Sequence, residues 1–488
     1  MSARDLLKDP AWQGSDLGHP LPDTPHAVSV ALPRWRDVIA YEENEVACRA
    51  ALQTLYPRFG IHPLLRQVTA ADSTPDSTPD STLWPYPTAD AAAEAQAHCH
   101  RKNQKAHTRI INISGLFCLQ ADAAATPHAK AFWQHTGLGA SSRLAAIALG
   151  GEPRPSTEAG DTARLRIRER LAAIHGTTTS RISLHPAGMA ALHSALKAVQ
   201  SLRPGRATLQ LGFPYVDVFK QPQVVFHGGE LVQGDDLSEV EEALERLDPG
   251  AVIVELPSNP LLRCVDLPAI CERAHSRGVP VIADDTIGTA LNLEALPCVD
   301  LLFTSLTKSF AGRGDVMAGS LVVSPHSPWS EQLMGALRPA TGLGDADAIA
   351  LEQASRDVEE RVPQLDQNCL ALAEQLQLHQ AIEQVLHPSK CSNYKALMRR
   401  GAGHGCLLSF VLKGGERKAQ RVYDALRVSK GPSLGTSFTL VCPYTQLAHY
   451  NELDWAERCG VPSHLLRVSV GLEDPNELWE RFELALDA

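Results

Sequence analysis

The stretch Leu301-Leu-Phe-Thr304-Ser305-Leu-Thr307-Lys308-Ser-Phe-Ala-Gly-Arg-Gly314 indicates both the fold and the chemistry of this chain. Its first four residues form a largely apolar run that predicts a buried strand, and two hydroxyls and one amine follow at its carboxyl end. Hydroxyl groups beside a backbone turn can hold a phosphate, and a lysine at such a place can form a Schiff base. The stretch therefore predicts a site in which Ser305, Thr307 and Lys308 act together.

A second apolar stretch about twenty residues earlier supplies a carboxylate to the same predicted site. Val279-Pro-Val-Ile-Ala283 predicts another strand, and Asp284-Asp285-Thr286 follows it directly. A buried carboxylate at that place suits a protonated pyridine nitrogen. A lone lysine in a loop is usually a solvated charge, so the argument rests on the combination. Lysine, carboxylate and phosphate-binding hydroxyls at the ends of neighbouring strands predict pyridoxal 5'-phosphate as the cofactor.

The alternation of apolar and amphipathic runs after about residue 160 predicts an α/β fold. Because strands and helices alternate, we expect a mainly parallel central sheet covered on both faces. After about residue 335 the pattern changes to a smaller α+β domain. The expected strands are 207–211, 224–227, 252–256, 279–283, 301–304, 406–412 and 466–470, and the expected helices are 163–173, 189–199, 267–277 and one long helix at 348–377.

The chain before this alternating part is irregular and rich in proline. It contains the repeat Asp72-Ser-Thr-Pro-Asp-Ser-Thr-Pro-Asp-Ser-Thr82, whose composition cannot bury a core and predicts a surface insertion. We therefore expect an N-terminal extension and arm at 1–159 with the insertion at 72–82, a cofactor-binding α/β domain at 160–335, and a C-terminal α+β domain at 336–488.

Composition excludes several classes of protein. The chain has 488 residues and a formal net charge of -11 without a basic stripe, which argues against a nucleic-acid or anionic-membrane partner. No run of about eighteen apolar residues and no signal-peptide pattern occurs, so we expect a cytoplasmic protein without a membrane span. Eleven scattered cysteines with no CxxC pair fit reduced thiols. The cluster His98-Cys99-His100, read as part of a strand, has no matching second pair, so no metal is expected.

Three further motifs add polar groups at predicted strand ends. Gly188-Met189 opens a helix, where free backbone amides and the helix dipole favour a phosphate. Tyr215 follows the strand at 207–211, and Asn259 lies between two prolines in a rigid turn. Competing cofactor motifs are absent: Gly312-Arg-Gly314 lacks the third glycine of a dinucleotide site, and no GxxxxGK loop or GxSxG elbow occurs.

These motifs, in this order, resemble the Cys/Met-metabolism family of pyridoxal-phosphate enzymes. The resemblance runs from about residue 160 to the end and implies an aspartate-aminotransferase-like (fold type I) transferase. Further segments resemble the long, fungal-like cystathionine γ-synthases of that family. Those segments are His26-Ala-Val-Ser-Val30, Tyr56-Pro-Arg58-Phe59, Phe132-Trp-Gln-His135-Thr-Gly137 and Lys430-Gly-Pro-Ser433-Leu-Gly435. The closing Leu466-Arg467-Val-Ser469-Val-Gly471-Leu-Glu473 resembles the Arg-x-Ser-x-Gly-x-Glu with which members of the whole family end.

The resemblance implies a role for each matching residue. Lys308 would carry the cofactor as a Schiff base, Asp284 would pair with the pyridine nitrogen, and Tyr215 would stack on the ring. Arg467 would bind the substrate carboxylate with its bidentate guanidinium. The other cofactor contacts implied are Gly188, Met189, Asn259, Ser305, Thr307 and Arg143, and the other substrate contacts are Asn259 and Ser433.

The sequence also departs from the family pattern. Shorter members carry a Tyr-x-Arg segment that reaches the phosphate in the neighbouring subunit, and Arg143 stands nearest to that place in an uncertain register. Asp284-Asp285 replaces the usual Asp-Asn. Thr436-Ser-Phe438 stands where many members have a glycine and a glutamate, which removes a charge near the expected nucleophile pocket.

The resemblance implies γ-replacement on an O-acylhomoserine with L-cysteine, giving cystathionine, in transsulfuration and methionine biosynthesis. It also implies a homotetramer built as a dimer of dimers, in which we expect the first 150 residues to pack on a partner and complete its site. Three enzyme alternatives remain open: a γ-lyase, an O-acetylhomoserine sulfhydrylase, and γ-substitution with a non-sulfur nucleophile. The non-enzyme alternative is a catalytically silent paralogue.

Overall fold

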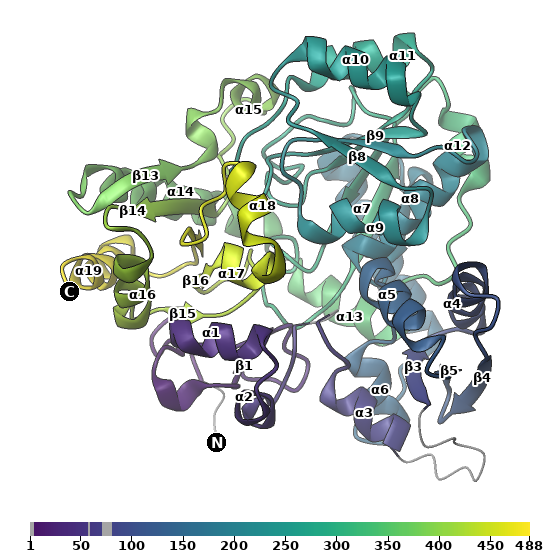
Figure 1. Ribbon diagram of the computed structural model, residues 1–488, viewed down its shortest axis with the longest axis horizontal. Helices are drawn as coiled ribbons and strands as arrows, with labels where there is room; N and C mark the ends of the chain where they lie inside the picture. The colour runs from purple at the N-terminus through teal and green to yellow at the C-terminus, as the bar shows by residue number, and fades with distance from the viewer. Residues whose placement is uncertain (1–3, 57–58, 71–80) are drawn as a thin grey trace.

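The computed structural model describes residues 4–56, 59–70 and 81–488, and a seven-stranded sheet lies at its centre (Figure 1). The strand order is β6-β12-β11-β10-β9-β7-β8. β12 is antiparallel to both of its neighbours, and every other pair is parallel. The mainly parallel central sheet predicted from the sequence is therefore confirmed. Its strands are β6 (Ile182–His185), β7 (Thr208–Leu211), β8 (Gly229–Val232), β9 (Ala251–Glu255), β10 (Val281–Asp284), β11 (Leu301–Thr304) and β12 (Gly319–Val323).

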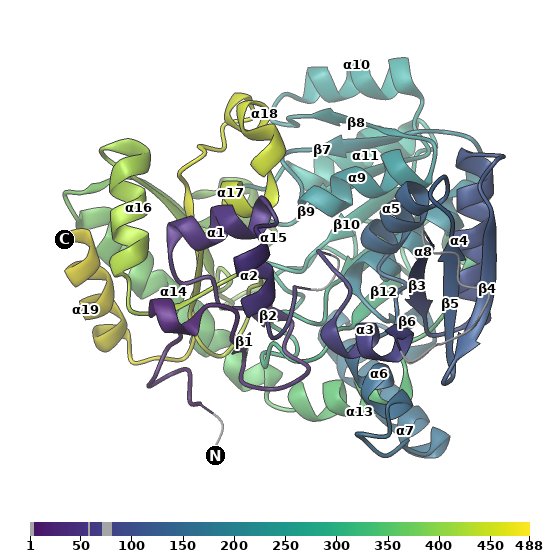
Figure 2. The ribbon, with the colours of Figure 1, turned by 60° about the horizontal axis from the view of Figure 1, so that its bottom comes forward.

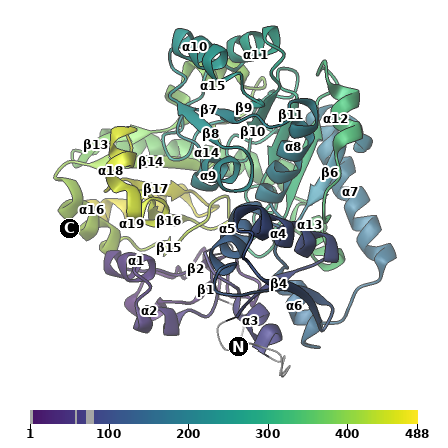
Figure 3. The same cartoon turned by 45° about the vertical axis from the view of Figure 1, so that its right-hand side comes forward.

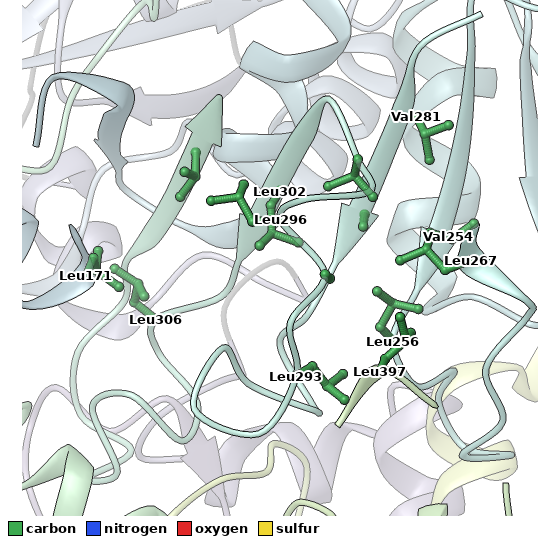
Figure 4. Packing of buried hydrophobic residues seen from close by; sticks show 14 of the residues in the cluster. Leu171, Val254, Leu256, Leu267, Val281, Leu293, Leu296, Leu302, Leu306 and Leu397 are labelled. Carbon is green, nitrogen blue, oxygen red and sulfur yellow. The ribbon is translucent and has the colours of Figure 1, made fainter. Parts of the chain in front are cut away.

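Helices cover both faces of this sheet because successive residues of each strand point to opposite sides. Val254 and Leu302 belong to one buried cluster, part of which Figure 4 shows with Leu171 and Leu267 from the covering helices. Ile253, which points to the opposite side of the sheet from Val254, belongs to a second cluster on the other face. Helices on the first face are α7 (Thr157–His175), α10 (Leu237–Leu247), α11 (Leu267–Ser276), α13 (Asp345–Ala354) and α14 (Val358–Leu378), and those on the second are α8 (Gly188–Leu202), α9 (Val216–Val225) and α12 (Ser330–Ala336).

One expected strand of this sheet is wrong. The apolar run at 224–227 was expected as a strand, but Val224 and Val225 form the last turn of α9 and the strand β8 begins at Gly229. A short apolar run has no period that separates a strand from a buried helix end. The left-handed Gly228 (φ 99°) provides the turn between the two elements.

The single long helix expected at 348–377 is two helices, α13 and α14, separated at residues 355–357. The Ser355 hydroxyl donates to the carbonyl of Leu351 at 2.8 Å, which is a typical way for serine to end a helix. The break directs the buried Arg361 toward the loop after Lys308, where its guanidinium donates to the carbonyls of Ser309 (2.6 Å) and Phe310 (3.1 Å). The interruption therefore helps to fix the lysine loop.

A five-stranded sheet in the order β13-β14-β17-β16-β15 follows in the C-terminal part, beside the central sheet (Figure 1). The strands expected at 406–412 and 466–470 are confirmed as β14 and β17. Its strands are β13 (Ile382–Leu386), β14 (Leu407–Leu412), β15 (Ser429–Lys430), β16 (Leu440–Pro443) and β17 (Leu466–Ser469), and its helices are α15 (Ser392–Leu397), α16 (Gly415–Ala425), α17 (Tyr444–Ala448), α18 (Leu453–Arg458) and α19 (Pro475–Leu486).

The N-terminal part is more regular than its sequence indicated. Strands β3, β5 and β4 form a three-stranded antiparallel sheet in that order, and a buried cluster that includes Trp84 and Phe132 lies against it. Helix α4 lies beside β4 (Figure 3), and its alanines belong to the same cluster. The cluster also includes Ala190 of α8 and Val225 of α9, so this region shares a core with the central domain. The elements are β1 (Pro20–Leu21), β2 (Ser29–Val30), α1 (Trp35–Glu42), α2 (Val46–Ala51), α3 (Pro63–Ala70), β3 (Thr82–Tyr86), α4 (Ala89–Lys102), β4 (Thr108–Ile113), β5 (Leu116–Ala121), α5 (Thr126–Thr136) and α6 (Ser142–Ala148).

The first part of the chain packs against the C-terminal sheet, several hundred residues away in sequence (Figure 2). The amide of Leu32 donates to the carbonyl of Lys430 at 2.9 Å, and the hydroxyl of Ser29 donates to the carbonyl of Pro432 at 2.5 Å. The amide of Val28 donates to the carbonyl of Gly314, in the loop after Lys308, at 2.8 Å. This segment is therefore integral to the fold.

Several other predictions fall on this part of the chain. His98-Cys99-His100 lies on helix α4 and not on a strand.

Across the described residues, no group of three or more histidine, cysteine, aspartate or glutamate side chains is arranged to hold a metal ion. Residues 72–80 of the expected insertion lie outside the described residues, and the predicted domain boundaries stay predictions. No helix in the described ranges combines the length and the apolarity needed to cross a bilayer.

Candidate active site

The carboxyl ends of the central strands and the C-terminal sheet enclose a cavity of about 120 Å³. Parallel strands present their carboxyl ends at the same edge, so polar residues far apart in sequence meet there. The structure brings together all of the predicted site residues except one. Those lining the cavity are Gly188, Met189, Tyr215, Asn259, Asp284, Ser305, Thr307, Lys308, Ser433 and Arg467.

Lys308 follows β11 and is 9% exposed. Its Nζ donates to the hydroxyl of Tyr56 at 3.0 Å and to the hydroxyl of Ser433 at 3.0 Å. Ser433 itself has a left-handed backbone (φ 88°), which is costly for a residue with a side chain and is typical of functional sites. The amine is therefore positioned by two neutral hydroxyls from two distant segments.

The two adjacent aspartates after β10 have different surroundings. Asp284 lines the cavity and accepts a hydrogen bond from the amide of Thr286 at 2.9 Å. Asp285 does not line the cavity, and it accepts from the hydroxyl of Thr304 at 2.5 Å. Burial raises the pKa of Asp284 to about 6 and the pKa of Asp285 to about 7. Only Asp284 can therefore reach a group bound in the cavity.

Glu255, at the end of β9, is a site residue that the sequence analysis did not select. Its Oε2 accepts hydrogen bonds from the amides of Tyr215 and Asn259, each at 3.0 Å. Burial raises the pKa of Glu255 well above its usual range, and the nearby charge of Asp284 raises it further. Glu255 therefore fixes the two loops that carry Tyr215 and Asn259.

Arg467 lies in β17 of the C-terminal sheet and faces the strand ends of the central sheet. Its guanidinium donates to Asn259 Oδ1 at 3.2 Å and to the carbonyl of Ser433 at 2.7 Å. The guanidinium carbon lies 4.9 Å from the centre of the Tyr444 ring. These contacts hold a buried cation, 6% exposed, in one orientation at the cavity wall.

The mouth of helix α8 is shaped for close approach of an anion. A Cβ added at Gly188 would lie 2.8 Å from the Cβ of Ser305, so only glycine lets the helix start beside that loop. The first turn of this fifteen-residue helix has no acidic side chain, so its free amides keep their positive potential. The donors here, with Lys308 and Asp284, therefore fit the phosphate, aldehyde and ring nitrogen of pyridoxal phosphate.

Tyr56 is the second residue that the sequence analysis missed, although Tyr56-Pro-Arg58 has the Tyr-x-Arg spacing that was sought near Arg143. Arg58 lies outside the described residues. The N-terminal segment was expected to complete the site of a partner subunit. Within its own chain Tyr56 lies against Lys308, because residues 28–32 bring this segment to the C-terminal sheet. The expected packing on a partner subunit stays a prediction.

Arg143 is the predicted site residue that the structure does not bring to the cavity. Its guanidinium donates to the carbonyl of Asp315 at 2.6 Å and lies 3.6 Å from the carboxylates of Asp315 and Asp347. It lines a separate small cavity beside His26. Because two carboxylates already surround it, Arg143 is not a phosphate ligand within its own chain.

A second, larger cavity of about 380 Å³ adjoins the first. Phe59, Val216, Leu447 and Ala448 line both cavities, so the two spaces meet at this shared wall. The walls of the second cavity are mainly polar, and they come from α1 to α3 with the segment around residue 60, from α5 and α9, and from the end of α17 and the residues after it. This N-terminal cavity gives a second molecule room beside the residues around Lys308.

Comparison with known proteins identifies the family. The model of the Cys/Met metabolism PLP-dependent enzymes matches residues 158–487, and that of the fungal trans-sulfuration enzyme N-terminal domain matches residues 61–141. Cystathionine gamma-synthase of Neurospora crassa is 31% identical over 96% of this chain and 98% of its own. The L-2-amino-4-chloropent-4-enoate dechlorinase/desaturase of Streptantibioticus cattleyicolor is 33% identical over 96% of this chain and 97% of its own.

Solved structures agree with this assignment. The structure of cystathionine gamma synthase from Xanthomonas oryzae pv. oryzae in complex with aminoacrylate and cysteine has a TM-score of 0.61 and 25% identity. The match covers 69% of this chain and 88% of that one. The fold is the aspartate-aminotransferase-like fold type I, as the sequence predicted. The chain belongs to the Cys/Met-metabolism family of pyridoxal-phosphate-dependent enzymes, with the N-terminal domain of its fungal trans-sulfuration members.

Proposed function

We propose that this enzyme catalyses γ-replacement on an O-acylhomoserine with L-cysteine, forming cystathionine. The observation that carries the proposal is the second cavity, which adjoins the cofactor cavity at a shared wall. A replacement reaction needs room for a nucleophile beside the first substrate, whereas an elimination needs none. The full-length similarity to cystathionine gamma-synthase of Neurospora crassa supports the same reaction.

Each predicted site residue has a distinct task in this proposal. Pyridoxal phosphate supplies an electrophilic carbon and a ring that accepts electrons. The amides of Gly188 and Met189, with the hydroxyls of Ser305 and Thr307, would hold its phosphate, and Tyr215 would stack on its ring. Asp284 is mostly ionised at neutral pH, because its pKa is about 6, so its carboxylate can hold a proton on the ring nitrogen.

Lys308 is the proton carrier of the proposal. Its Nζ lies between the hydroxyls of Tyr56 and Ser433, close to where the substrate α-carbon would lie. The amine removes the proton from the α-carbon and moves a proton at the β-carbon. Arg467 binds the substrate carboxylate, and Asn259 orients that guanidinium.

The proposed bond changes at the γ-carbon balance without another reagent. The bond between the γ-carbon and the acyloxy oxygen breaks, and the acid leaves as its carboxylate with the electron pair. The cysteine sulfur, after losing its proton, forms the new carbon–sulfur bond at the same carbon. Exclusion of water by the buried wall of the first cavity prevents loss of the reactive fragment.

The test uses purified enzyme with O-acetyl- or O-succinylhomoserine, with and without L-cysteine, and mass spectrometry of the products. Cystathionine formed faster than 2-oxobutanoate is the expected result, and Lys308→Ala is the inactive control. Release of 2-oxobutanoate alone, at a rate indifferent to cysteine, would contradict the proposal and indicate a γ-lyase.

A second candidate is γ-substitution with a different nucleophile in specialised metabolism. The similarity to the Streptantibioticus dechlorinase/desaturase supports chemistry other than cysteine addition, because that relative is named for dechlorination and desaturation of an amino acid. The size of the second cavity also favours it, since 380 Å³ accommodates more than cysteine. Substitution products with other nucleophiles, formed in competition with cysteine, would distinguish the two candidates.

We also propose a homotetramer built as a dimer of dimers, a cytoplasmic location, and domains at 1–159, 160–335 and 336–488. Light scattering checks the assembly: a fully active monomer would contradict it. Limited proteolysis checks the domains, because exposed boundary segments are cut first.

A further inference from the structure

The second cavity contains a buried carboxylate that no role in the first cavity uses. Glu42 ends helix α1, and its Oε1 is buried without a hydrogen-bond partner among the described residues. The neighbouring Tyr41 hydroxyl is likewise buried and unpartnered there. Burial raises the pKa of Glu42 to about 8. An unpaired carboxylate is costly to bury, and the negative end of the α1 dipole adds to that cost.

Positively charged side chains that lack a carboxylate partner lie at the same cavity. Arg49, Arg66 and Lys130 line it, and all three are exposed. None of them forms an ion pair with the part of the chain that the structure describes. Lys220, by contrast, is 3.1 Å from the carboxylate of Glu452, which neutralises it. The cavity therefore has three cations without an ion pair at exposed positions and one buried carboxyl group, whose raised pKa a bound ammonium would lower.

This separation of charge is complementary to one class of small molecule. A zwitterionic α-amino acid carries an ammonium, a carboxylate and a side chain on a single carbon. Its ammonium suits Glu42 and the Tyr41 hydroxyl, and its carboxylate suits the exposed cations. Phe59, Val216, Leu447 and Ala448 form the wall shared with the first cavity, so the side chain would extend through that apolar neck toward Lys308.

We propose that this cavity is the binding site of the second substrate and that it selects a zwitterionic amino acid as the nucleophile. Glu42 binds the ammonium of that amino acid, and Arg66 with Lys130 attracts its carboxylate. The inference rests on the proposed replacement function and names its acceptor site. It also assigns the selection of the nucleophile to the N-terminal segment, since Glu42, Phe59 and Arg66 all belong to it.

A binding experiment tests this site without turnover. Borohydride reduction of the holoenzyme fixes the cofactor on the lysine, so an added amino acid can no longer react with it. Titration calorimetry then measures the binding of L-cysteine, kept reduced, to this form. We expect saturable binding that Glu42→Gln weakens by about 10- to 100-fold, because a charge-assisted hydrogen bond is lost. Glu45→Gln is the matched control, since Glu45 is exposed and does not line the cavity.

A kinetic experiment distinguishes a loss of charge recognition from a general loss of activity in the variant. Glu42→Gln should raise the KM for L-cysteine by a similar factor while the KM for 2-mercaptoethanol, a thiol without either charge, stays unchanged. Release of 2-oxobutanoate without any nucleophile should also stay unchanged. Absence of L-cysteine binding to the reduced enzyme, or equal weakening of both thiols, would overturn the inference. Failure of the proposed function would appear separately, as binding of L-cysteine without formation of cystathionine.

Discussion

The two cavities around Lys308 are built in different ways. The first rests on the ends of adjacent parallel strands, and its chemical groups are buried and fixed by short contacts, such as those of Asp284 and Glu255. The second is formed by helices and loops, namely the N-terminal elements with α5, α9 and the end of α17, and its charged groups are partly exposed. The sheet therefore supplies the common chemistry of the family, and the added N-terminal segment can vary the choice of partner substrate.

The largest loss of turnover is expected for a change at Lys308, in the first cavity. Lys308→Ala should lower turnover by at least about 10³-fold, because the proton carrier and the attachment point are lost together. Peptide mapping after borohydride reduction should find the cofactor label on Lys308 in the unmodified enzyme. Lys395→Ala, at an exposed position, should be unaffected. A label on Lys220 or Lys430 would contradict this assignment.

Variants of Asp284 and Asp285 test whether one or both of these carboxylates support the ring nitrogen of the cofactor. Asp284→Asn should keep cofactor binding but lower kcat by about 10²-fold, because the ring nitrogen loses its charged partner. Asp285→Asn should have a much smaller effect on kcat, since Asp285 faces Thr304 and not the cavity. Near-normal turnover in the Asp284 variant would transfer the role to Asp285.

A variant of Arg467 tests whether the two substrates bind at separate sites. Arg467→Lys should raise the KM for the O-acylhomoserine by about 10-fold, because a lysine cannot keep the bidentate geometry. The KM for the nucleophile should change little if the second cavity binds it independently. Steady-state kinetics with each substrate varied in turn measures both values, and equal increases in the two would contradict separate sites.

Tyr56 lines the first cavity and contacts Lys308 through its hydroxyl, so a smaller effect is expected there. Tyr56→Phe removes one of the two hydroxyls that accept from Lys308 Nζ and should lower kcat by about 5-fold. A double-mutant cycle with Ser433→Ala should show coupling, because both hydroxyls contact the same amine. Strict additivity of the two variants would mean that these contacts do not act on Lys308 together.

The smallest expected effect is on stability without cofactor, and it depends on pH. Burial raises the pKa of Asp284 to about 6, so the folded protein keeps a proton there after the unfolded chain has lost it. Its contribution to the free energy of unfolding therefore falls from about pH 4 to about pH 6 and then stays low. The Asp284→Asn variant has no carboxyl group to ionise at this position, so its free energy of unfolding does not fall in this way. Its apoprotein should melt a few °C above the unmodified apoprotein at pH 8 and close to it at pH 4. Equal melting differences at both pH values would contradict the assigned ionisation.

The sequence predicted the first cavity far better than the second, for a physical reason. Ser305, Thr307, Lys308 and Asp284 follow apolar strands directly, and parallel strand ends must meet at one edge of a sheet. The contact of Tyr56 with Lys308 spans 252 positions and depends on how two separate sheets pack together. No local pattern encodes such a contact, so Tyr56, Glu255 and Glu42 were not selected. Arg143, predicted for the phosphate of a neighbouring subunit, lies outside the cavity of its own chain, and its role across a subunit interface stays a prediction.

The errors in secondary structure have the same origin. The run at 224–227 and the break at Ser355 are short features whose outcome depends on tertiary neighbours. The helix at 267–277 was predicted closely because it has a clear period, and the strand at 301–304 because its apolar run lies between the polar Asp300 and Ser305. The buried sheet of the N-terminal part was missed because alanine-rich helix α4 carries a weak amphipathic signal.

The packing of residues 29–32 against residues 430–432 has a consequence for how the protein is made. Ribosomes add about 5–20 residues per second, so a partner that lies about 400 positions later appears roughly 20–80 s after the first segment. During that interval the apolar Val30 and Leu32, both fully buried in the finished fold, have no native surface to contact. These residues can therefore dock only after the C-terminal sheet has been synthesised, and until then their apolar side chains are exposed to aggregation.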